Sequence, residues 1–409
     1  MNKIRKSNLN KIRKSKNIGL FCKWLGIYFF FLPLGAMNIG SLGSLLKILA
    51  LVPVFIWLTK KHTIKINYVI INTLFFVLIC TLSIVWSINF DESVSRAVSH
   101  ITFFILLVAV SGYSYDDGEI YYLKKCLIWS SRITALLTLA FGSYLQGRLY
   151  LNGIISEDPN YLCAYFLFGA VMDIIILLTA QISKKKKFFS VIELMVYLFI
   201  ILATGSRGGV TAFATATIIS LFLYSDSNGA ITLTLLKKLL ICLFIFIGLY
   251  LVMKLLPQDI VLRFSSDAIK ESNGTGRYEL WEDAFFTFKH SSFFRQIAGY
   301  GTGTVIDITY LFPFHRHNVM HNIFVENLIE IGCVGLFTYV INIVSYIYSS
   351  IKNKDLYSLA VISGMVVMSL STSLYTFKPY WNIMLFILCV TYARKDTLER
   401  KSNENLSFI

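Results

Sequence analysis

The chain alternates between long apolar runs and short polar segments from one end to the other. The apolar runs recur at lengths of about 20 residues, which is what an α-helix needs to cross the hydrocarbon core of a bilayer. They predict twelve membrane-spanning helices, over residues 19–37, 42–59, 67–86, 99–113, 126–145, 160–180, 188–204, 208–224, 239–256, 322–349, 356–374 and 381–393. The expected fold class is therefore an all-α polytopic membrane protein, with residues 1–409 forming a single integral membrane domain.

The composition excludes a soluble globule, because 56% of the residues are hydrophobic and the mean hydropathy is +0.65. In a soluble chain the formal net charge of +15 would indicate nucleic-acid binding, but here the lysines cluster between the predicted spans. Nucleic acid is therefore not an expected partner. The seven cysteines lie in or beside apolar runs without a Cys-x-x-Cys pair, so neither a zinc site nor a disulfide framework is indicated.

The positive charges also predict how the helices are oriented. The first 16 residues carry seven Lys or Arg and no acid, which is typical of a cytoplasmic flank. No small-residue cleavage site follows, so the first apolar run is expected to be a retained span. Alternating the spans from this end gives every inside loop at least two Lys or Arg, and every short outside loop one at most. Both termini are therefore expected in the cytoplasm.

One predicted outside segment, residues 257–320, is much longer than the others. Within it, residues 277–290 place apolar side chains at i, i+3, i+4 and i+7, namely Trp281, Ala284, Phe285 and Phe288. This spacing predicts an amphipathic helix that lies on the membrane surface or over a cavity mouth. The glycine cluster Gly299–Gly303 follows; it is either a phosphate-cradling loop or a flexible turn, and the turn is favoured.

A polar, histidine-bearing segment runs directly into the predicted span 322–349. His321 should lie near the boundary of water and lipid, where an imidazole can accept a proton from a hydroxyl group. The alternative is that it only anchors the helix at the interface. His315, His317 and His321 have a spacing that could suit a metal, but no carboxylate or cysteine lies among them, so no metal is expected.

Arg207 lies in the segment Thr204–Gly209, between two spans that almost touch in sequence. A charge at that depth is costly and indicates a partner or a function. Its guanidinium group could offer a fork of donors to phosphate oxygens, or it could extend to lipid head groups. Arg277 is a second such fork or a solvated charge. Asn160, in the segment Asp158-Pro-Asn160, fits a turn in which the amide caps a helix.

Taken together and in order, these segments resemble the O-antigen ligase and O-antigen polymerase superfamily. The resemblance is carried by Asp158-Pro-Asn160, Thr204-Gly-Ser-Arg207-Gly-Gly209, Gly276-Arg277-x3-Trp281, Gly299-x-Gly301-x-Gly303 and His321-Asn322-x3-Glu326-x3-Glu330-x-Gly332-x2-Gly335. It implies a bundle of about twelve helices related to the GT-C glycosyltransferases, with a large extracytoplasmic loop, in the bacterial cytoplasmic (inner) membrane. One departure is that ligases often show Arg-x3-Leu in this loop, whereas Leu280 is one residue closer here.

The resemblance also implies an activity, which is transfer of a glycan from undecaprenyl pyrophosphate without a metal or another cofactor. Arg207 and Arg277 then fall on the arginines that bind the pyrophosphate, and His321 on the catalytic base. Further candidates for substrate contacts are Asn160, Trp281, Gly301, Asn322 and Glu330. The expected partners are undecaprenyl-pyrophosphate-linked glycans, membrane lipids, and a flippase and a chain-length regulator of the same pathway.

Two kinds of acceptor are compatible with this activity. A polymerase joins lipid-linked repeat units into O-antigen or capsular polysaccharide, whereas a ligase transfers the glycan to lipid A core or another acceptor. The polymerase is favoured, because nothing in the chain marks a specialised acceptor domain. A membrane transporter or flippase is less expected, because the two halves of the chain show no internal repeat.

Overall fold

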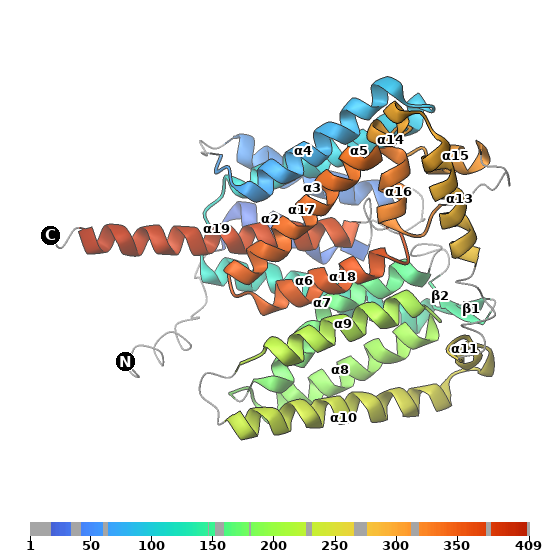
Figure 1. The fold of residues 1–409 in the computed structure, drawn as a ribbon. Coiled ribbons are helices and arrows are strands. Elements are labelled where there is room, and N and C mark those ends of the chain that lie inside the picture. The colour runs from blue at the N-terminus through green and yellow to red at the C-terminus, as the bar shows by residue number, and fades with distance from the viewer. Residues whose placement is uncertain are drawn as a thin grey trace.

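The computed structural model describes residues 18–33, 42–59, 64–145, 147–151, 159–179, 181–225, 231–265, 276–311, 319–373 and 378–406. Long helices pack side by side into a bundle, and the short helices collect at one end of it (Figure 1). The first part of the chain forms α2 (Leu20–Phe30), α3 (Leu42–Leu58), α4 (Tyr68–Leu82), η2 (Ser83–Trp86), α5 (Phe90–Ser111), α6 (Asp117–Phe141), α7 (Pro159–Leu178), α8 (Lys184–Ala203), α9 (Arg207–Leu223) and α10 (Ile231–Leu255). The second part forms α11 (Gln258–Arg263), α13 (Arg277–His290), α14 (Phe293–Ala298), α15 (Val305–Leu311), α16 (Ile323–Glu330), α17 (Gly332–Lys352), α18 (Leu356–Ser369) and α19 (Lys378–Leu406).

The chain is an all-α polytopic membrane protein. Among the described residues, five helices are long and apolar enough to cross a membrane: Tyr68–Trp86, Phe90–Ser111, Pro159–Leu178, Leu235–Leu255 and Gly332–Lys352. Four more apolar helices are shorter: Leu20–Phe30, Leu45–Leu58, Arg207–Leu223 and Leu356–Ser369. Large apolar side chains on the outer helices, such as Phe222 and Phe246, are exposed, which suits contact with lipid.

Polar caps fix where several helices begin. Asn67, Asn89 and Asn322 each accept a hydrogen bond from a backbone N–H in the first turn of the helix that follows. Asp116 and Glu119 form a capping box at the start of α6, in which each side chain accepts from the other residue's backbone. These caps satisfy N–H groups that a helix leaves unpaired at its start, so the polar residues between the apolar runs set the helix boundaries.

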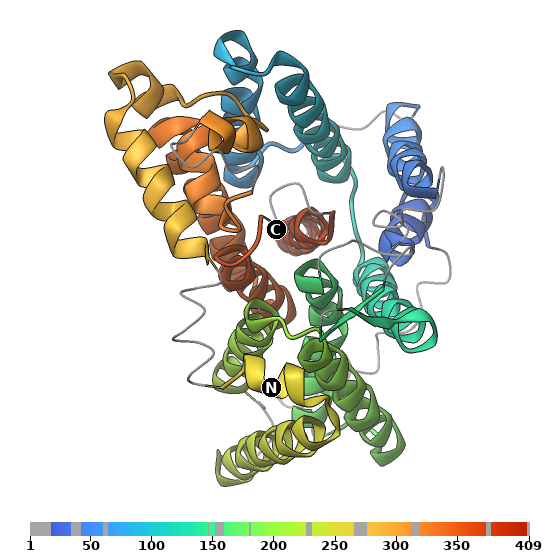
Figure 2. The ribbon, with the colours of Figure 1, turned by 90° about the vertical axis from the view of Figure 1, so that its right-hand side faces the viewer.

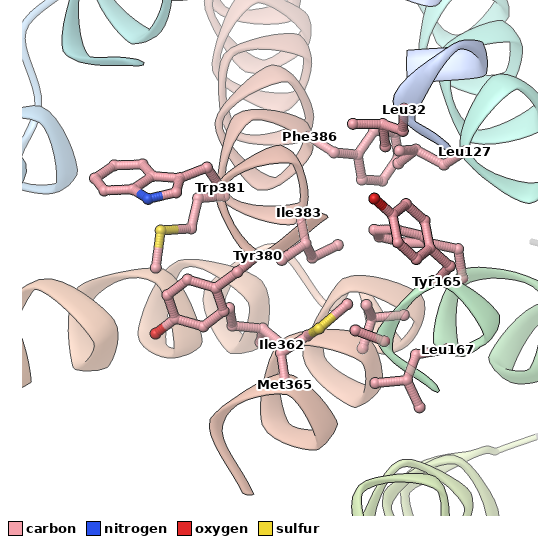
Figure 3. Close-up of a cluster of buried hydrophobic side chains, with 14 of the residues drawn as sticks. Leu32, Leu127, Tyr165, Leu167, Ile362, Met365, Tyr380, Trp381, Ile383 and Phe386 are labelled. Atoms are coloured by element: carbon pink, nitrogen blue, oxygen red, sulfur yellow. The ribbon is translucent and has the colours of Figure 1, made fainter. Parts of the chain in front are cut away.

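α19 lies in the centre of the bundle when the molecule is viewed from the end that carries the short helices (Figure 2). Its side chains Tyr380, Trp381 and Phe386 are buried. Figure 3 shows these rings among apolar side chains of neighbouring helices, including Met365 of α18 and Tyr165 of α7. The core is therefore built around the C-terminal helix, with earlier helices arranged about it.

Two features differ from the expected spans. The predicted span 126–145 ends at Phe141, and the chain then forms an antiparallel pair of short strands, β1 (Ser143–Leu145) and β2 (Arg148–Tyr150). Gly147 makes the turn between them, with a left-handed φ of 65°. The hairpin adds a small sheet to an otherwise helical fold.

The second difference is a break in the predicted span 322–349, which the structure divides into α16 and α17. Gly332 adopts a φ of 69°, and a Cβ atom there would lie 2.2 Å from the carbonyl oxygen of Ile297. Glycine is therefore required, because it lets the backbone at the end of α14 lie directly against the start of α17. The break turns α16 out of line with the membrane helix.

Candidate functional site

The turn between α8 and α9 positions Arg207. Ser206 caps α9: its hydroxyl oxygen accepts the Gly209 N–H at 2.9 Å, and its O–H donates to Oδ1 of Asn160 at 2.6 Å. Arg207 is the first residue of α9, and its Nε donates to the carbonyl oxygen of Arg263 at 3.0 Å. Asn160 therefore holds the turn from α7, as a hydrogen-bond acceptor rather than as the cap expected from the sequence.

Two further arginines lie at the same turn. The Nε of Arg148 donates to the carbonyl oxygen of Thr204 at 2.8 Å, and its Nη2 reaches Oδ1 of Asn160 at 3.4 Å. The Nε of Arg263 lies 3.0 Å from the position of a Cβ atom at Gly205. Burial, together with the charges of Arg148 and Arg207, lowers the pKa of Arg263 from its usual value. We call Arg148, Arg207 and Arg263 the arginine cluster.

Arg148 and Arg263 were not predicted as site residues, because they lie far from Arg207 along the chain. The available signal was their predicted side of the membrane, since all three arginines fall in outside segments. The hairpin brings the first of them to the turn, and α11 brings the other.

The glycines after Arg207 serve packing rather than ligand access. A Cβ atom at Gly208 would lie 1.8 Å from Oγ of Ser371, and one at Gly209 would lie 2.5 Å from Sγ of Cys163. Both positions are buried. The space beside these two glycines is therefore filled by Ser371, which follows α18, and by Cys163 of α7.

His321 lies immediately before the cap of α16 and is half-buried. Its φ of 50° is left-handed, which is uncommon for a residue with a side chain. Asn322 follows as the cap, and its Oδ1 accepts N–H groups of Phe324 at 3.0 Å and Val325 at 3.4 Å. A residue held in such a conformation by its surroundings is typical of functional sites.

α13 packs against α16 and reaches the residue next to His321. The Nε1–H of Trp281 donates to the carbonyl oxygen of Met320 at 2.9 Å. An apolar cluster fills the space between these elements: Leu280, Ala284, Val305, Ile308, Met320, Val325 and Ile329. Arg277 is the first residue of α13 and is half-buried. Trp281 is thereby tied to the histidine segment, and Arg277 lies one turn before Trp281 on the same helix.

α13 is buried on one side only. Leu280 is 5% exposed, whereas Phe285 is 50% exposed. The helix therefore buries the side centred on Leu280 and Ala284, because it packs on α16 within the protein.

Glu330 closes the glycine turn. Its carboxylate accepts the N–H of Gly303 at 2.8 Å and the N–H of Val305 at 3.0 Å, and its carbonyl oxygen accepts the N–H of Gly301 at 2.7 Å. A carboxylate of the protein therefore occupies donors that a phosphate-cradling loop would offer to a ligand. These contacts give Gly301 and Glu330 a structural role.

The segment Ser371–Ser373, after α18, joins the arginine cluster to the histidine helix. Ser371 packs against Gly208, as described above. The Ser373 hydroxyl donates to the buried carboxylate of Glu326 on α16. The carbonyl oxygen of Ser373 accepts a hydrogen bond from the Tyr161 hydroxyl at 3.0 Å. Tyr161 directly follows Asn160 on α7. A continuous set of contacts therefore connects the two parts of the candidate site.

Three expected residues, Asp158, His315 and His317, lie outside the described residues. Among the described His, Cys, Asp and Glu side chains, no group of three gathers in a way that could hold a metal ion. No curated protein matches the chain. Residues 192–340, which include Arg207, Arg277 and His321, match the family model described as O-antigen ligase, which is consistent with the resemblance to the O-antigen ligase and polymerase superfamily.

Proposed function

We propose that the protein is a polysaccharide polymerase, which transfers an undecaprenyl-pyrophosphate-linked glycan to the distal sugar of another lipid-linked repeat unit. The product would be O-antigen or capsular polysaccharide. One observation carries the proposal: contacts through Ser371–Ser373 connect the arginine cluster to the His321 segment. A polyanionic leaving group and a hydroxyl nucleophile need those two kinds of group on one rigid frame.

The arginines act on the leaving group. As the bond from the anomeric carbon to the phosphate oxygen breaks, negative charge develops on the lipid pyrophosphate. Arg207 and Arg277 supply forked donors to its oxygens, and Arg148 and Arg263 add positive charge at the same turn. The charges that lower the pKa of Arg263 would then be offset by the bound anion.

His321 acts on the acceptor. Its imidazole takes the proton of an acceptor sugar hydroxyl while that oxygen bonds to the anomeric carbon from the face opposite the pyrophosphate. The product therefore has inverted configuration, the carrier lipid leaves as the pyrophosphate, and the proton stays on the histidine. Asn322 and Trp281 hold this segment in place through the contacts described above. We expect the reaction to need no metal, since the donor is already activated.

The proposed setting is the outer face of the bacterial cytoplasmic membrane. Twelve spans and cytoplasmic termini are supported by the lysine distribution, and every predicted apolar run overlaps a helix of the fold. A GT-C-like bundle is what the family resemblance implies. Residues 257–320 would then face the outside, where lipid-linked glycans are the available donors. A flippase and a chain-length regulator would supply the repeat units and limit the product.

A reconstituted assay tests the proposal. The purified protein is incubated with a lipid-linked repeat unit, and a polymerase yields a ladder of longer lipid-linked glycans together with free undecaprenyl pyrophosphate. A parallel reaction adds lipid A core. Product formed only when lipid A core is present would replace the polymerase with the ligase, and the absence of transfer to either acceptor would refute both.

A further inference from the structure

A cavity of about 320 Å³ lies between α3 and α5, and neither the arginine cluster nor His321 lines it. Tyr28 of α2 and Lys378 of α19 complete its wall. Most of its lining is apolar, and Phe103 on this wall is held by stacking on Trp381, with ring centroids 5.1 Å apart. Its volume is at the lower end of the range for small-molecule sites.

Two lysines line this cavity, Lys47 on α3 and Lys378 at the start of α19. No aspartate or glutamate is among the lining residues in the part of the chain that the structure describes. Burial, and then the charge of Lys47, lower the pKa of Lys378 to about 8. An anion in the cavity would offset both effects, because it would replace the lost water and oppose the second charge.

The cavity lining has a charged end and an apolar remainder, as the binding of an amphiphile requires. Lys47, Leu51 and Val54 follow one another at helical spacing on the same face of α3. The positive charge is therefore at one end of the wall, and the apolar side chains continue from it along the helix. In the proposed topology the lysine end is toward the outside of the membrane. A phosphate head group at the lysines would let its hydrocarbon chain extend along Leu51, Val54 and Leu106.

We propose that this cavity binds the head group and adjoining chain of a second polyprenyl pyrophosphate, the carrier of the acceptor repeat unit. This inference rests on the proposed polymerase function, because polymerisation uses two substrates carried on polyprenyl pyrophosphate, whereas transfer to a lipid A core uses one. The pyrophosphate that leaves needs forked donors at the arginine cluster. The acceptor's pyrophosphate does not react, so it needs only the attraction that lysine point charges provide.

Photolabelling tests the site without relying on transfer. The full chain is reconstituted in discs of zwitterionic lipid with an undecaprenyl pyrophosphate that carries a photoreactive group in its first isoprene units. We expect labelled peptides from α3 and α5 in the wild type and in Arg207→Ala. The double variant Lys47→Gln/Lys378→Gln should lose this labelling, and Lys47→Arg/Lys378→Arg should retain it. Lys254→Gln, an exposed lysine at the outer end of α10, is the matched control.

Acceptor kinetics provide the second measurement. Loss of the two lysines should raise the acceptor KM about tenfold or more, which corresponds to roughly 1.4 kcal/mol, with little change in kcat. Unchanged labelling in the double glutamine variant, or equal competition by phosphatidylglycerol, would overturn the assignment. If the lysine-dependent labelling occurs but no transfer is found with any acceptor, the polymerase proposal fails and a carrier-lipid site remains. A normal acceptor KM in the double variant, alongside active polymerisation, would refute the cavity site alone.

Discussion

The left-handed backbone at His321 makes it possible to remove the imidazole without straining the fold. Glycine and asparagine adopt this conformation readily, so His321→Gly and His321→Asn should leave the protein folded. If the imidazole is the base, both variants should lose roughly 10² to 10⁴ in transfer rate while still binding the lipid-linked donor. Transfer rates and donor binding with the purified variants provide the check. Near-normal turnover in either variant would remove His321 from the mechanism.

Arginine differs from lysine in the geometry of its hydrogen-bond donors, and this difference can be used to test the proposed pyrophosphate site. Arg207→Ala and Arg277→Ala should each abolish or greatly reduce polymer, and lysine at either position should rescue poorly, because a point charge lacks the two-pronged contact with phosphate. Arg148→Ala and Arg263→Ala should weaken donor binding as well, since both lie at the same turn. The length and amount of polymer should be measured for each variant at equal protein level. Full activity in all four alanine variants would contradict a pyrophosphate site.

At the scale of elements, the sequence predicted where helices lie much better than how they meet. The apolar runs locate the membrane helices because lipid permits few other structures. The break at Gly332 and the packing role of Gly208 depend on distant backbone and side-chain atoms, and local pattern does not contain them. Arg148 and Arg263 join the site for the same reason, through a hairpin and a short helix that were not predicted.

Gly332 gives a test of the break between α16 and α17. Alanine there would be strained by the left-handed backbone, at a cost of roughly 1–3 kcal/mol, and its Cβ would also lie 2.2 Å from the Ile297 carbonyl oxygen. Gly276 is the matched control, because its φ is 76° but no atom lies within 4 Å of its Cβ position. Thermal unfolding in detergent should therefore show a larger loss for Gly332→Ala than for Gly276→Ala. Equal melting temperatures would contradict the close backbone contact.

At the scale of the whole molecule, the proposed function depends on the side of the membrane to which the site belongs. The arginine cluster and the His321 segment both lie at the end of the bundle that carries the short helices (Figure 1). Lipid-linked glycans serve as donors at the outer face, so the mechanism requires this end to face outward. The bundle alone fits either orientation, and the lysine distribution selects one.

Reporter fusions can test that orientation directly. The proposed topology puts Lys184–Lys187 in the cytoplasm and the segment around residue 271 outside, with three spans between them. An odd number of crossings separates the two positions, so a reporter active only outside should signal at the second and remain silent at the first. A reporter that works only in the cytoplasm should give the reverse pattern at the same positions. If both fusions report one compartment, the number of crossings between them is even, and the segment that carries Arg277 would share a side with the lysine loop.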